Sequence, residues 1–393
     1  MKKTLATLLL LAVVALVVTG LLVVASASAL KGPTPWFFLK RQVTWLAFAV
    51  GLGFFASKFD YHYWKKVLIW KKYPLYTMGF YLLLAFLLAL TLCPGLAVEH
   101  KGSYRWLYIG GNQIFQPGEF AKLAIIVTLA FWLDHVKWRV QQFKEGIAIP
   151  ALLLGTYALL LFLEKDLGAT MVVCVIGGVL IFVGGARWRH LLALGASGSL
   201  VLAGIILLAM NTNFMGAMFE NRMERIKAWR EGSGDAAWQV EQSIIAFKSG
   251  GLQGVGFNQS TQKQFYLPEA HTDFIFAIGG EELGFFFSIG VLVAYAILLM
   301  CGVLVSIYAP DRLGRLLAFG MTLLLVFQGA FNIGVVTDFL PTKGMALPFM
   351  SYGGSNLLTA LFAIGTIYNV LRHMGVRDER MHTHVIRNAA DTV

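Results

Sequence analysis

The sequence contains few charged residues: 13% of its 393 residues are Asp, Glu, Lys or Arg, whereas 58% are hydrophobic. A soluble domain carries about 25% charged residues and does not need this much apolar surface. Apolar runs of roughly 17–25 residues recur along the chain, which is the length that crosses a bilayer as a helix. The scarcity of charge therefore excludes a soluble globular protein and predicts a helical membrane protein.

Cysteine is equally scarce, and several functional motifs are missing. Cys93, Cys174 and Cys301 lie in or beside apolar runs, and they are too few and too scattered for a disulfide framework or a thiolate metal site. The sequence shows no zinc-ligand spacing, serine-nucleophile motif, nucleotide fingerprint or internal repeat. His382 and His384, near the end of the chain, are only a weak metal signal.

The net charge of +11 does not indicate a nucleic-acid-binding protein, because the basic residues lie between the hydrophobic runs and do not cluster on a soluble domain. More than half of the Lys and Arg residues fall on one side if Met1 is cytoplasmic, which is the charge bias of cytoplasmic segments. We therefore expect both termini in the cytoplasm and no nucleic-acid partner.

We predict an all-α polytopic membrane protein with ten transmembrane helices, a single domain over 1–373 and a short cytoplasmic tail at 374–393. One long extracytoplasmic loop, 211–274, separates spans seven and eight. MKK at the start and ASASA after the first apolar run resemble a secretory signal, but the run is long enough to be retained as a span. The predicted spans are 4–30, 40–57, 74–93, 118–134, 147–163, 168–186, 188–210, 275–307, 314–338 and 354–372.

Polar residues near the apolar segments gather on the outer side of this topology. Glu119 and Lys122 are three residues apart and can pair on one helix face. Cations here suit an anionic head group such as a diphosphate, so we expect a site near the outer leaflet. The set comprises Arg105, Trp106, Glu119, Lys122, Glu164, Lys165, Asp166, Asp273, Asp338 and Lys343.

The segment YLPEAHTDFIFAIGGEELG, at 266–284, carries the most chemistry. Asp273 is flanked by apolar residues, and a carboxylate at such a boundary has its charged form disfavoured, which makes it a better general base. Its local alternative is a helix cap, in which Thr272 or Asp273 opens span eight. We interpret Glu281 and Glu282 as an inward-facing packing pair. GGLQGVGFNQS, at 250–260, lacks the GK[ST] ending of a nucleotide loop and predicts a turn.

Four segments in order resemble the SEDS proteins (shape, elongation, division and sporulation) of the FtsW/RodA type. The resemblance extends over most of the chain from about residue 100. The ten predicted spans also match that family. The segments are GSYRWLYIGGNQIFQPGEFAKL, WQVEQSIIAFKSGGLQGVGFNQSTQK, YLPEAHTDFIFAIGGEELG and PTKGMALPFMSYGGSNLL.

The resemblance implies a peptidoglycan glycosyltransferase. Such an enzyme polymerises lipid II, which is linked to undecaprenyl diphosphate, on the outer face of the bacterial inner membrane, beside a class B penicillin-binding protein. The catalytic aspartate of the family falls on Asp273. A divalent cation, Mg²⁺ or Mn²⁺, is expected without identified ligands, and membrane lipids surround the chain. The residues expected at the substrate are Arg105, Trp106, Glu119, Lys122, His271 and Lys343.

Two departures from the family pattern stand out. QPGE places Gly118 where a serine often stands, which puts any role for that hydroxyl in doubt. EKDLGAT, at 164–170, replaces the usual QPDLGT, and the missing proline predicts a different turn between spans five and six. Neither departure touches the aspartate segment.

Three functional alternatives stay open beside a polymerase of the division septum. Ten spans without a soluble domain also suit a lipid II flippase, although transporter sites lie nearer the bilayer middle. A scaffold that only recruits the transpeptidase is another alternative, and a RodA-type elongation enzyme is the third. GEELG and QSIIAF look closer to the division type, so we expect the protein at the septum.

Overall fold

The structure is a computed structural model, and it describes residues 1–29, 34, 36–63, 75–93, 105–109, 112–196, 198, 234–264 and 266–375. Within these residues the chain is predominantly helical. The α-helices are α1 (Lys2–Ala27), α2 (Phe37–Lys58), α4 (Leu75–Leu90), α5 (Pro117–Val136), α6 (Ile149–Leu163), α7 (Leu167–Val183), α10 (Asp235–Gly250), α11 (Ile275–Ile307), α12 (Arg312–Val336) and α13 (Gly354–His373).

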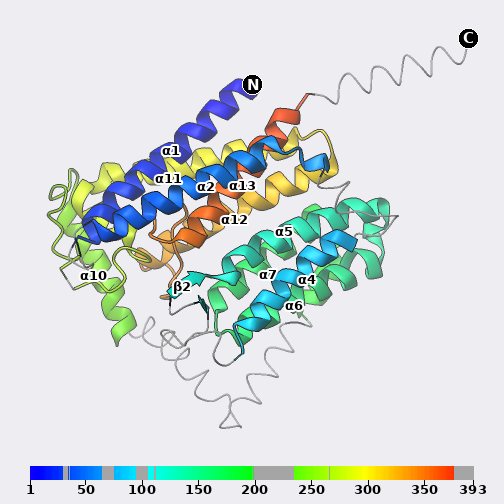
Figure 1. The fold of residues 1–393 in the computed structure, drawn as a ribbon, viewed down its shortest axis with the longest axis horizontal. Helices are drawn as coiled ribbons and strands as arrows, with labels where there is room; N and C mark the ends of the chain where they lie inside the picture. Colours follow the sequence, from blue (N-terminus) through cyan, green and yellow to red (C-terminus); the bar gives the residue numbers. More distant parts are fainter. Residues whose placement is uncertain are drawn as a thin grey trace, which may run out of the picture.

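The helices form two groups that meet at α12 (Figure 1). In one group α1 packs on α11, and α2 packs on α13. In the other group α5 packs on α4 and α7, and α6 packs on α7. Helix α12 contacts α11 and α13 on one side and α5 and α7 on the other, so it joins both groups into one bundle.

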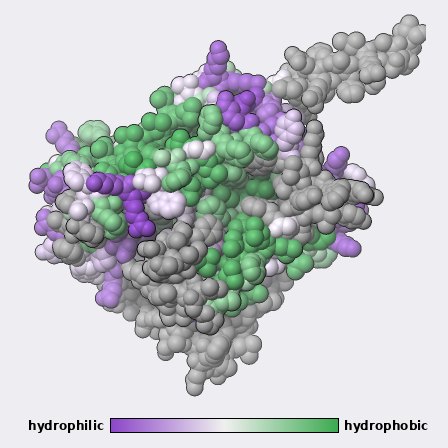
Figure 2. Space-filling model, in the orientation of Figure 1, coloured by the Kyte–Doolittle hydropathy of each residue, from purple (hydrophilic) through white to green (hydrophobic). Residues whose placement is uncertain are grey.

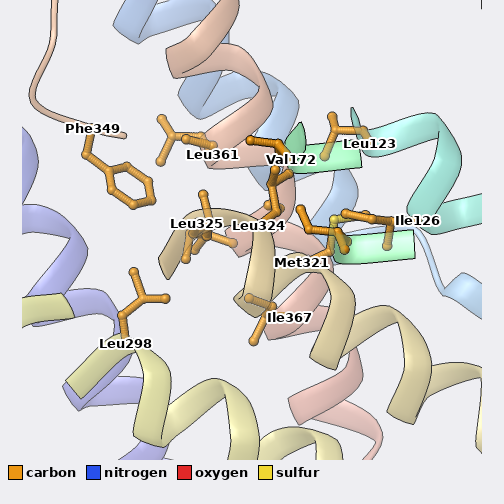
Figure 3. Close-up of a cluster of buried hydrophobic side chains, with 14 of the residues drawn as sticks. Leu123, Ile126, Val172, Leu298, Met321, Leu324, Leu325, Phe349, Leu361 and Ile367 are labelled. Carbon is orange, nitrogen blue, oxygen red and sulfur yellow. The ribbon is translucent and has the colours of Figure 1, made fainter. Parts of the chain in front are cut away.

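The core lies along α12 because its buried leucines and methionine face both groups. Met321, Leu324 and Leu325 are at most 2% exposed. Figure 3 shows these side chains between Ile126 of α5 and Leu298 of α11. Apolar burial contributes roughly 25 cal/mol per Å² in water, but between helices in lipid the gain comes chiefly from close packing.

Five helical segments are long and apolar enough to cross a membrane, among the residues that the structure describes. They are Lys2–Ala27, Lys144–Leu163, Ile275–Ile307, Arg312–Val336 and Gly354–His373. Hydrophobic side chains cover the middle of the molecular surface in Figure 2, and hydrophilic residues lie toward its two ends. Exposed aromatic residues such as Phe48, Phe54 and Phe86 suit a lipid-facing surface.

The predicted span pattern agrees with the helices, but the number of spans stays a prediction. The described residues of every predicted span are mainly helical; in span 188–210 these are residues 188–196 and 198, and most of that span lies outside the described residues. Lys2 Nζ lies 3.5 Å from the carbonyl oxygen of Arg372, so the start of α1 and the end of α13 lie at the same end of the bundle. This agrees with termini on one side of the membrane.

Two features of the fold differ from the sequence prediction. The fold is helical as predicted except at one short hairpin, in which β1 (Leu107–Ile109) pairs antiparallel with β2 (Asn112–Phe115). Two glycines separate these strands in the sequence, which is a hairpin signal that the helical reading overlooked. The long loop 211–274 also contains α10, which packs on α11.

Helix α11 is kinked at Gly284, where φ is +77°. The turn at 250–260 lies against this kink, because a Cβ on Gly254 would clash with the backbone of Glu282 and Leu283. The backbone N–H of Val255 donates to the carbonyl of Glu281 at 2.9 Å. The glycine-rich segment is therefore a turn, as predicted, and it binds the helix that follows Asp273.

Candidate functional site

Side chains of neighbouring elements donate hydrogen bonds to the backbone around Asp273 and hold it in place. Asn332 of α12 donates from Nδ2 to the carbonyl oxygens of Asp273, at 2.7 Å, and of Met345, at 2.6 Å. Ser351 Oγ donates to the carbonyl of Thr272 at 2.5 Å. The segment that carries Asp273 is thereby joined to α12 and to the loop 341–353.

The Asp273 carboxylate lies against the backbone of Gly344. A Cβ built on that glycine would overlap Oδ2 of Asp273. Gly344 directly follows Lys343, which the sequence placed at the substrate. Glycine at 344 is therefore what allows the carboxylate to approach the Lys343 loop.

Asp273 does not cap the helix that follows it. The N-cap residue of α11 is Phe274, and no side chain caps this helix. Thr272 Oγ1 instead donates to Glu269, at 2.9 Å to its carboxylate. The capping interpretation of Thr272 or Asp273 is therefore wrong, because the turn of residues 269–274 places both residues before the N-cap position.

Asp166 is the centre of a charge cluster at the same end of the bundle. Its Oδ2 lies 3.1 Å from Arg105 Nε, and its Oδ1 lies 3.6 Å from Lys343 Nζ. Oδ1 also accepts the backbone N–H of Ala169 at 3.1 Å and so caps α7. Burial alone would raise the pKa of Asp166, but the two cations and the N–H hold its pKa below the ordinary value.

Glu119 and Lys122 pair on α5, as their spacing predicts. Lys122 Nζ lies 2.7 Å from Glu119 Oε1, and the lysine side chain is only 3% exposed. The charge of Lys122 also acts on Asp166. Three cations, Arg105, Lys122 and Lys343, therefore surround two carboxylates, which leaves the group one positive charge in excess.

Glu164 differs from these carboxylates because burial raises its pKa to about 8. Thr91 Oγ1 lies 2.5 Å from Glu164 Oε1 and 2.6 Å from the carbonyl of Leu88. The Thr91 hydroxyl donates to Glu164, which lowers the pKa of this carboxyl but does not offset the effect of burial. Burial therefore favours the protonated form of Glu164.

The structure shows the surroundings of both departures from the family pattern. A Cβ on Gly118 would make a tight contact with Leu161, at 3.3 Å, and an ordinary van der Waals contact with Glu164 Oε2, at 4.0 Å. Lys165 has φ +61°, a left-handed conformation that proline cannot adopt. Lysine at this position thus permits the turn that brings Asp166 to the start of α7.

His271 and Trp106 have other surroundings. The His271 ring packs against Phe38, with centroids 4.9 Å apart, and against Tyr352, at 5.6 Å. This agrees with a role in shaping the start of the segment. Trp106 is half-buried and directly follows Arg105 at the beginning of the hairpin. Contact of either residue with substrate stays a prediction.

Glu281 and Glu282 are a buried pair, as interpreted from the sequence, and each is 1% exposed. Glu282 Oε1 accepts from Lys263 Nζ at 2.9 Å and from Ser26 Oγ of α1. Glu281 accepts from the hydroxyl of Ser260 and from the N–H of the next residue, Thr261, at 3.1 Å. These bonds attach the loop before Asp273 to α11 and α1.

Sequence reasoning grouped Asp166 with other outer charges but missed its central position, and it did not place Asn332 beside Asp273. Only the fold brings residues this far apart in the chain together. The described carboxylates of this cluster already bind Lys, Arg or Thr91, so they do not form a carboxylate cage for Mg²⁺ or Mn²⁺. The expected divalent cation stays a prediction, and no step below depends on it.

Comparisons with known proteins identify the family. A family model described as "Cell cycle protein", for FtsW, RodA and SpoVE, matches residues 6–375. A Geobacter sulfurreducens relative named "Probable peptidoglycan glycosyltransferase FtsW" is 38% identical over 372 residues, which are 92% of this chain and 94% of the relative. "Stage V sporulation protein E" of Bacillus subtilis is 38% identical over 382 residues, 95% of this chain and 98% of that one.

Solved structures show the same fold. A chain of the structure described as "Structural coordination of polymerization and crosslinking by a peptidoglycan synthase complex" matches with a TM-score of 0.73 and 28% identity, over 93% of this chain and 96% of that chain. Rod shape determining protein RodA of Thermus thermophilus matches with a TM-score of 0.65 and 28% identity, over 93% and 96%. The match along nearly the whole chain, in sequence and in fold, establishes that this protein belongs to the FtsW/RodA/SpoVE family.

Proposed function

We infer that this protein is a peptidoglycan glycosyltransferase that polymerises lipid II into β-1,4 glycan strands for cell division. One observation carries the inference: the Asp273 carboxylate lies against Gly344, next to the lysine that shares Asp166 with Arg105. A base and a set of cations therefore lie at one end of the bundle. The Geobacter relatives, named as glycosyltransferases of the FtsW type, support the same activity.

Asp273 is the proposed general base. It takes the proton of the 4-hydroxyl on the acceptor N-acetylglucosamine, and the hydroxyl oxygen attacks C1 of the donor N-acetylmuramic acid. A new C1–O bond forms while the bond from C1 to the diphosphate oxygen breaks. Attack from the face opposite the leaving group converts the α-linked donor into a β-1,4 product, so the displacement inverts.

The cations supply the second part of the mechanism. Lys343 and Arg105 are the proposed contacts of the diphosphate leaving group, which gains negative charge as the C1–O bond breaks. Both are partly exposed, with side chains at 17% and 28%, so their N–H groups can reach a ligand. A general base is worth about 10²–10⁴-fold, so positioning and leaving-group stabilisation must supply the remaining rate enhancement.

The environment of the enzyme follows from this substrate. The Asp273 end faces outward from the inner membrane, where lipid II presents its disaccharide. A class B penicillin-binding protein cross-links the strands that the enzyme produces, and the solved complex that couples polymerisation and crosslinking supports this partner. The division septum is the proposed location. An elongation role is the alternative, because the RodA fold is also similar.

Lipid II polymerisation by the purified full chain tests the proposal. Asp273→Asn keeps the size of the side chain and removes the base, so we expect the variant to fold and to lose glycan-strand synthesis by at least about 10²-fold. Asp235→Asn is the matched control, because Asp235 is an exposed aspartate in the first turn of α10. Full activity of the Asp273 variant would exclude the mechanism, and head-group translocation without polymer would favour the flippase.

A further inference from the structure

A second cluster of titratable side chains lies at the opposite end of the bundle, where α1 and α13 have their termini. Asp60 and His62 follow the end of α2, and His373 is the last residue of α13. Asp311 is the N-cap residue of α12. The glycosyltransferase mechanism uses none of these residues, and the end of α13 meets them because it runs alongside α2.

The three residues Asp60, His62 and His373 have ligand atoms in a tight group. His62 Nδ1 lies 2.7 Å from Asp60 Oδ1, and His373 Nε2 lies 3.5 Å from Asp60 Oδ2. One ligand atom from each of the three lies within 4.8 Å of the others. Ligands of a tetrahedral zinc ion, bound at about 2.0–2.1 Å, are separated by roughly 3.3 Å, so these side chains need only small movements to bind one.

The remaining nitrogen of each imidazole has an acceptor, as in metal-binding histidines. His62 Nε2 lies 3.1 Å from Asp311 Oδ2, and His373 Nδ1 lies 2.9 Å from the carbonyl of Asn369. With a metal bound, these two acceptors would take the hydrogens of His62 Nε2 and His373 Nδ1. His62 Nδ1 and His373 Nε2, which face the Asp60 carboxylate, would then be the ligating nitrogens.

Asp311 is itself held firmly, so it can orient His62. Its Oδ1 accepts from Tyr61 OH at 3.0 Å and from the N–H of Gly314 at 2.8 Å. Its other oxygen is the one that faces His62. An oriented acceptor of this kind fixes the plane and the tautomer of a metal-binding imidazole, and it increases the basicity of the ligating nitrogen.

We propose that Asp60, His62 and His373 bind one divalent cation of the zinc class, with Asp311 and Asn369 as hydrogen-bond partners of the two imidazoles. Two imidazoles and one carboxylate suit Zn²⁺ and similar transition metals, whereas Mg²⁺ prefers oxygen ligands alone. The ligand side chains are 28–39% exposed, which leaves room for a water molecule as the fourth ligand. The ion would join the end of α2 to the end of α13.

The competing interpretation is an ion cluster without metal, in which protonated imidazoles bind the two aspartates. Burial alone would raise the pKa of Asp60, but the hydrogen bonds from His62 and the nearby imidazoles hold its pKa below the ordinary value. A carboxylate that stays charged suits both interpretations. The two interpretations predict different results when Zn²⁺ is added, because an ion cluster that does not bind metal has no zinc site to saturate.

Metal content of the purified full chain tests the proposal. The full chain is purified with an affinity tag that contains no histidine. A chelator removes bound metal, and the protein is then titrated with Zn²⁺. We expect about one tightly bound Zn²⁺ per chain, since a folded site binds a structural metal at a defined stoichiometry. His62→Gln and His373→Gln should each lose it. Asp311→Asn, which can still cap α12, should weaken binding by about 10–100-fold.

Control variants separate this site from other histidines. His382→Gln with His384→Gln removes the histidine pair of the tail, and His190→Gln removes a histidine that packs on Phe143 instead. Each control should keep the full zinc content. If the tail variant loses the ion while the His62 variant keeps it, the proposed ligands are wrong.

Cobalt substitution keeps the proposal testable if a histidine variant does not fold. Co²⁺ bound to the wild-type chain by two imidazoles, one carboxylate and water should give the visible absorption of a tetrahedral site. Zn²⁺ should displace it and should raise the thermal midpoint of the wild-type chain until the site is saturated. A wild-type chain that binds neither ion saturably would overturn the proposal.

Discussion

The ammonium group of Lys343 lies 3.6 Å from the carboxylate of Asp166, and this ion pair joins the loop after α12 to the turn before α7. The lysine side chain also crosses Gly168, where a Cβ would clash with its Cε. The two groups of helices therefore meet at this pair as well as along α12. Because Gly344 follows Lys343 and contacts Asp273, the pair also orders the surroundings of the proposed base.

Asp166→Asn should reduce polymerisation, because asparagine lacks the charge that positions Lys343 and Arg105. Asparagine can still cap α7, so the helix itself should persist. Lys343→Met should abolish most activity, and the double variant should be no worse than Lys343→Met alone, because partners in one network are not additive. Glycan synthesis from lipid II measures each effect. Lys248→Met, which changes an exposed lysine of α10, is the control. If the losses of the two single variants add in the double variant, Asp166 and Lys343 are not coupled.

Gly344→Ala should displace the Asp273 carboxylate, because the new methyl group would occupy the position of Oδ2. We expect a loss of polymerisation approaching that of Asp273→Asn, with a smaller effect on stability. Gly290→Ala in α11 is the matched control, since a Cβ there meets nothing within 4 Å. The control should be neutral or should stabilise by roughly 0.5–1 kcal/mol, the helix preference of alanine over glycine. Normal activity of Gly344→Ala would show that the contact between Gly344 and Asp273 is not needed for catalysis.

Glu164→Gln should change how stability depends on pH. The folded-state pKa of Glu164, about 8, is above its ordinary value of 4.5. Its contribution to stability is therefore fully present below about 4.5 and is lost as the pH rises through about 8. Glutamine stays neutral, so the thermal midpoint of the variant should fall less between pH 5 and pH 9.

Asp166 acts in the opposite sense and at lower pH. Because its pKa is lowered, the charged form of Asp166 contributes stability at pH values above 3.8, its ordinary pKa. This contribution is lost only in acid, so it does not change between pH 5 and pH 9. Thermal unfolding by intrinsic fluorescence across this window makes the comparison. The same pH slope in both chains would show that Glu164 is not the buried acid.

Glu282→Gln should destabilise the chain, because it leaves the ammonium of Lys263 buried without its charged partner. Removing one member of a buried ion pair typically costs about 3–5 kcal/mol. Lys263→Met should do the same, and the combined replacement by Met at both positions should be less harmful than either single change. Glu241→Gln, an exposed glutamate of α10, is the control. Chemical denaturation in mild detergent measures the order of the variants.

Much of the helical pattern was predictable, because the residues of a span must be apolar whatever they pack against. The ends of α11 and α12 agree with the predicted spans to within about two residues. The Glu119–Lys122 pair was predictable for a similar reason, since residues three apart share one helix face. The hairpin at 107–115 was not predicted, because two strands this short carry little periodicity.

The site was predictable only in part. Motif resemblance selected Asp273 and Lys343, but their spatial relation depends on Gly344 and on the hydrogen bonds of Asn332. The helix-cap interpretation failed because the N-cap position falls on Phe274, one residue after Asp273, and local preference does not resolve a shift of one residue. From the sequence, Glu164 was one of several charges in the turn between spans five and six. Only the structure shows that its carboxyl group is buried beside Thr91.

The sequence by itself determined that this chain is a helical membrane protein, where its apolar segments lie and which family its motifs resemble. These properties follow from composition and local spacing, which do not need a fold. Tertiary structure alone decided that Asp166 shares two cations from distant segments and that His62 meets His373 beside Asp60. Such contacts depend on which helices pack together, and helix packing in a membrane is set by shape and by polar pairing across the whole bundle.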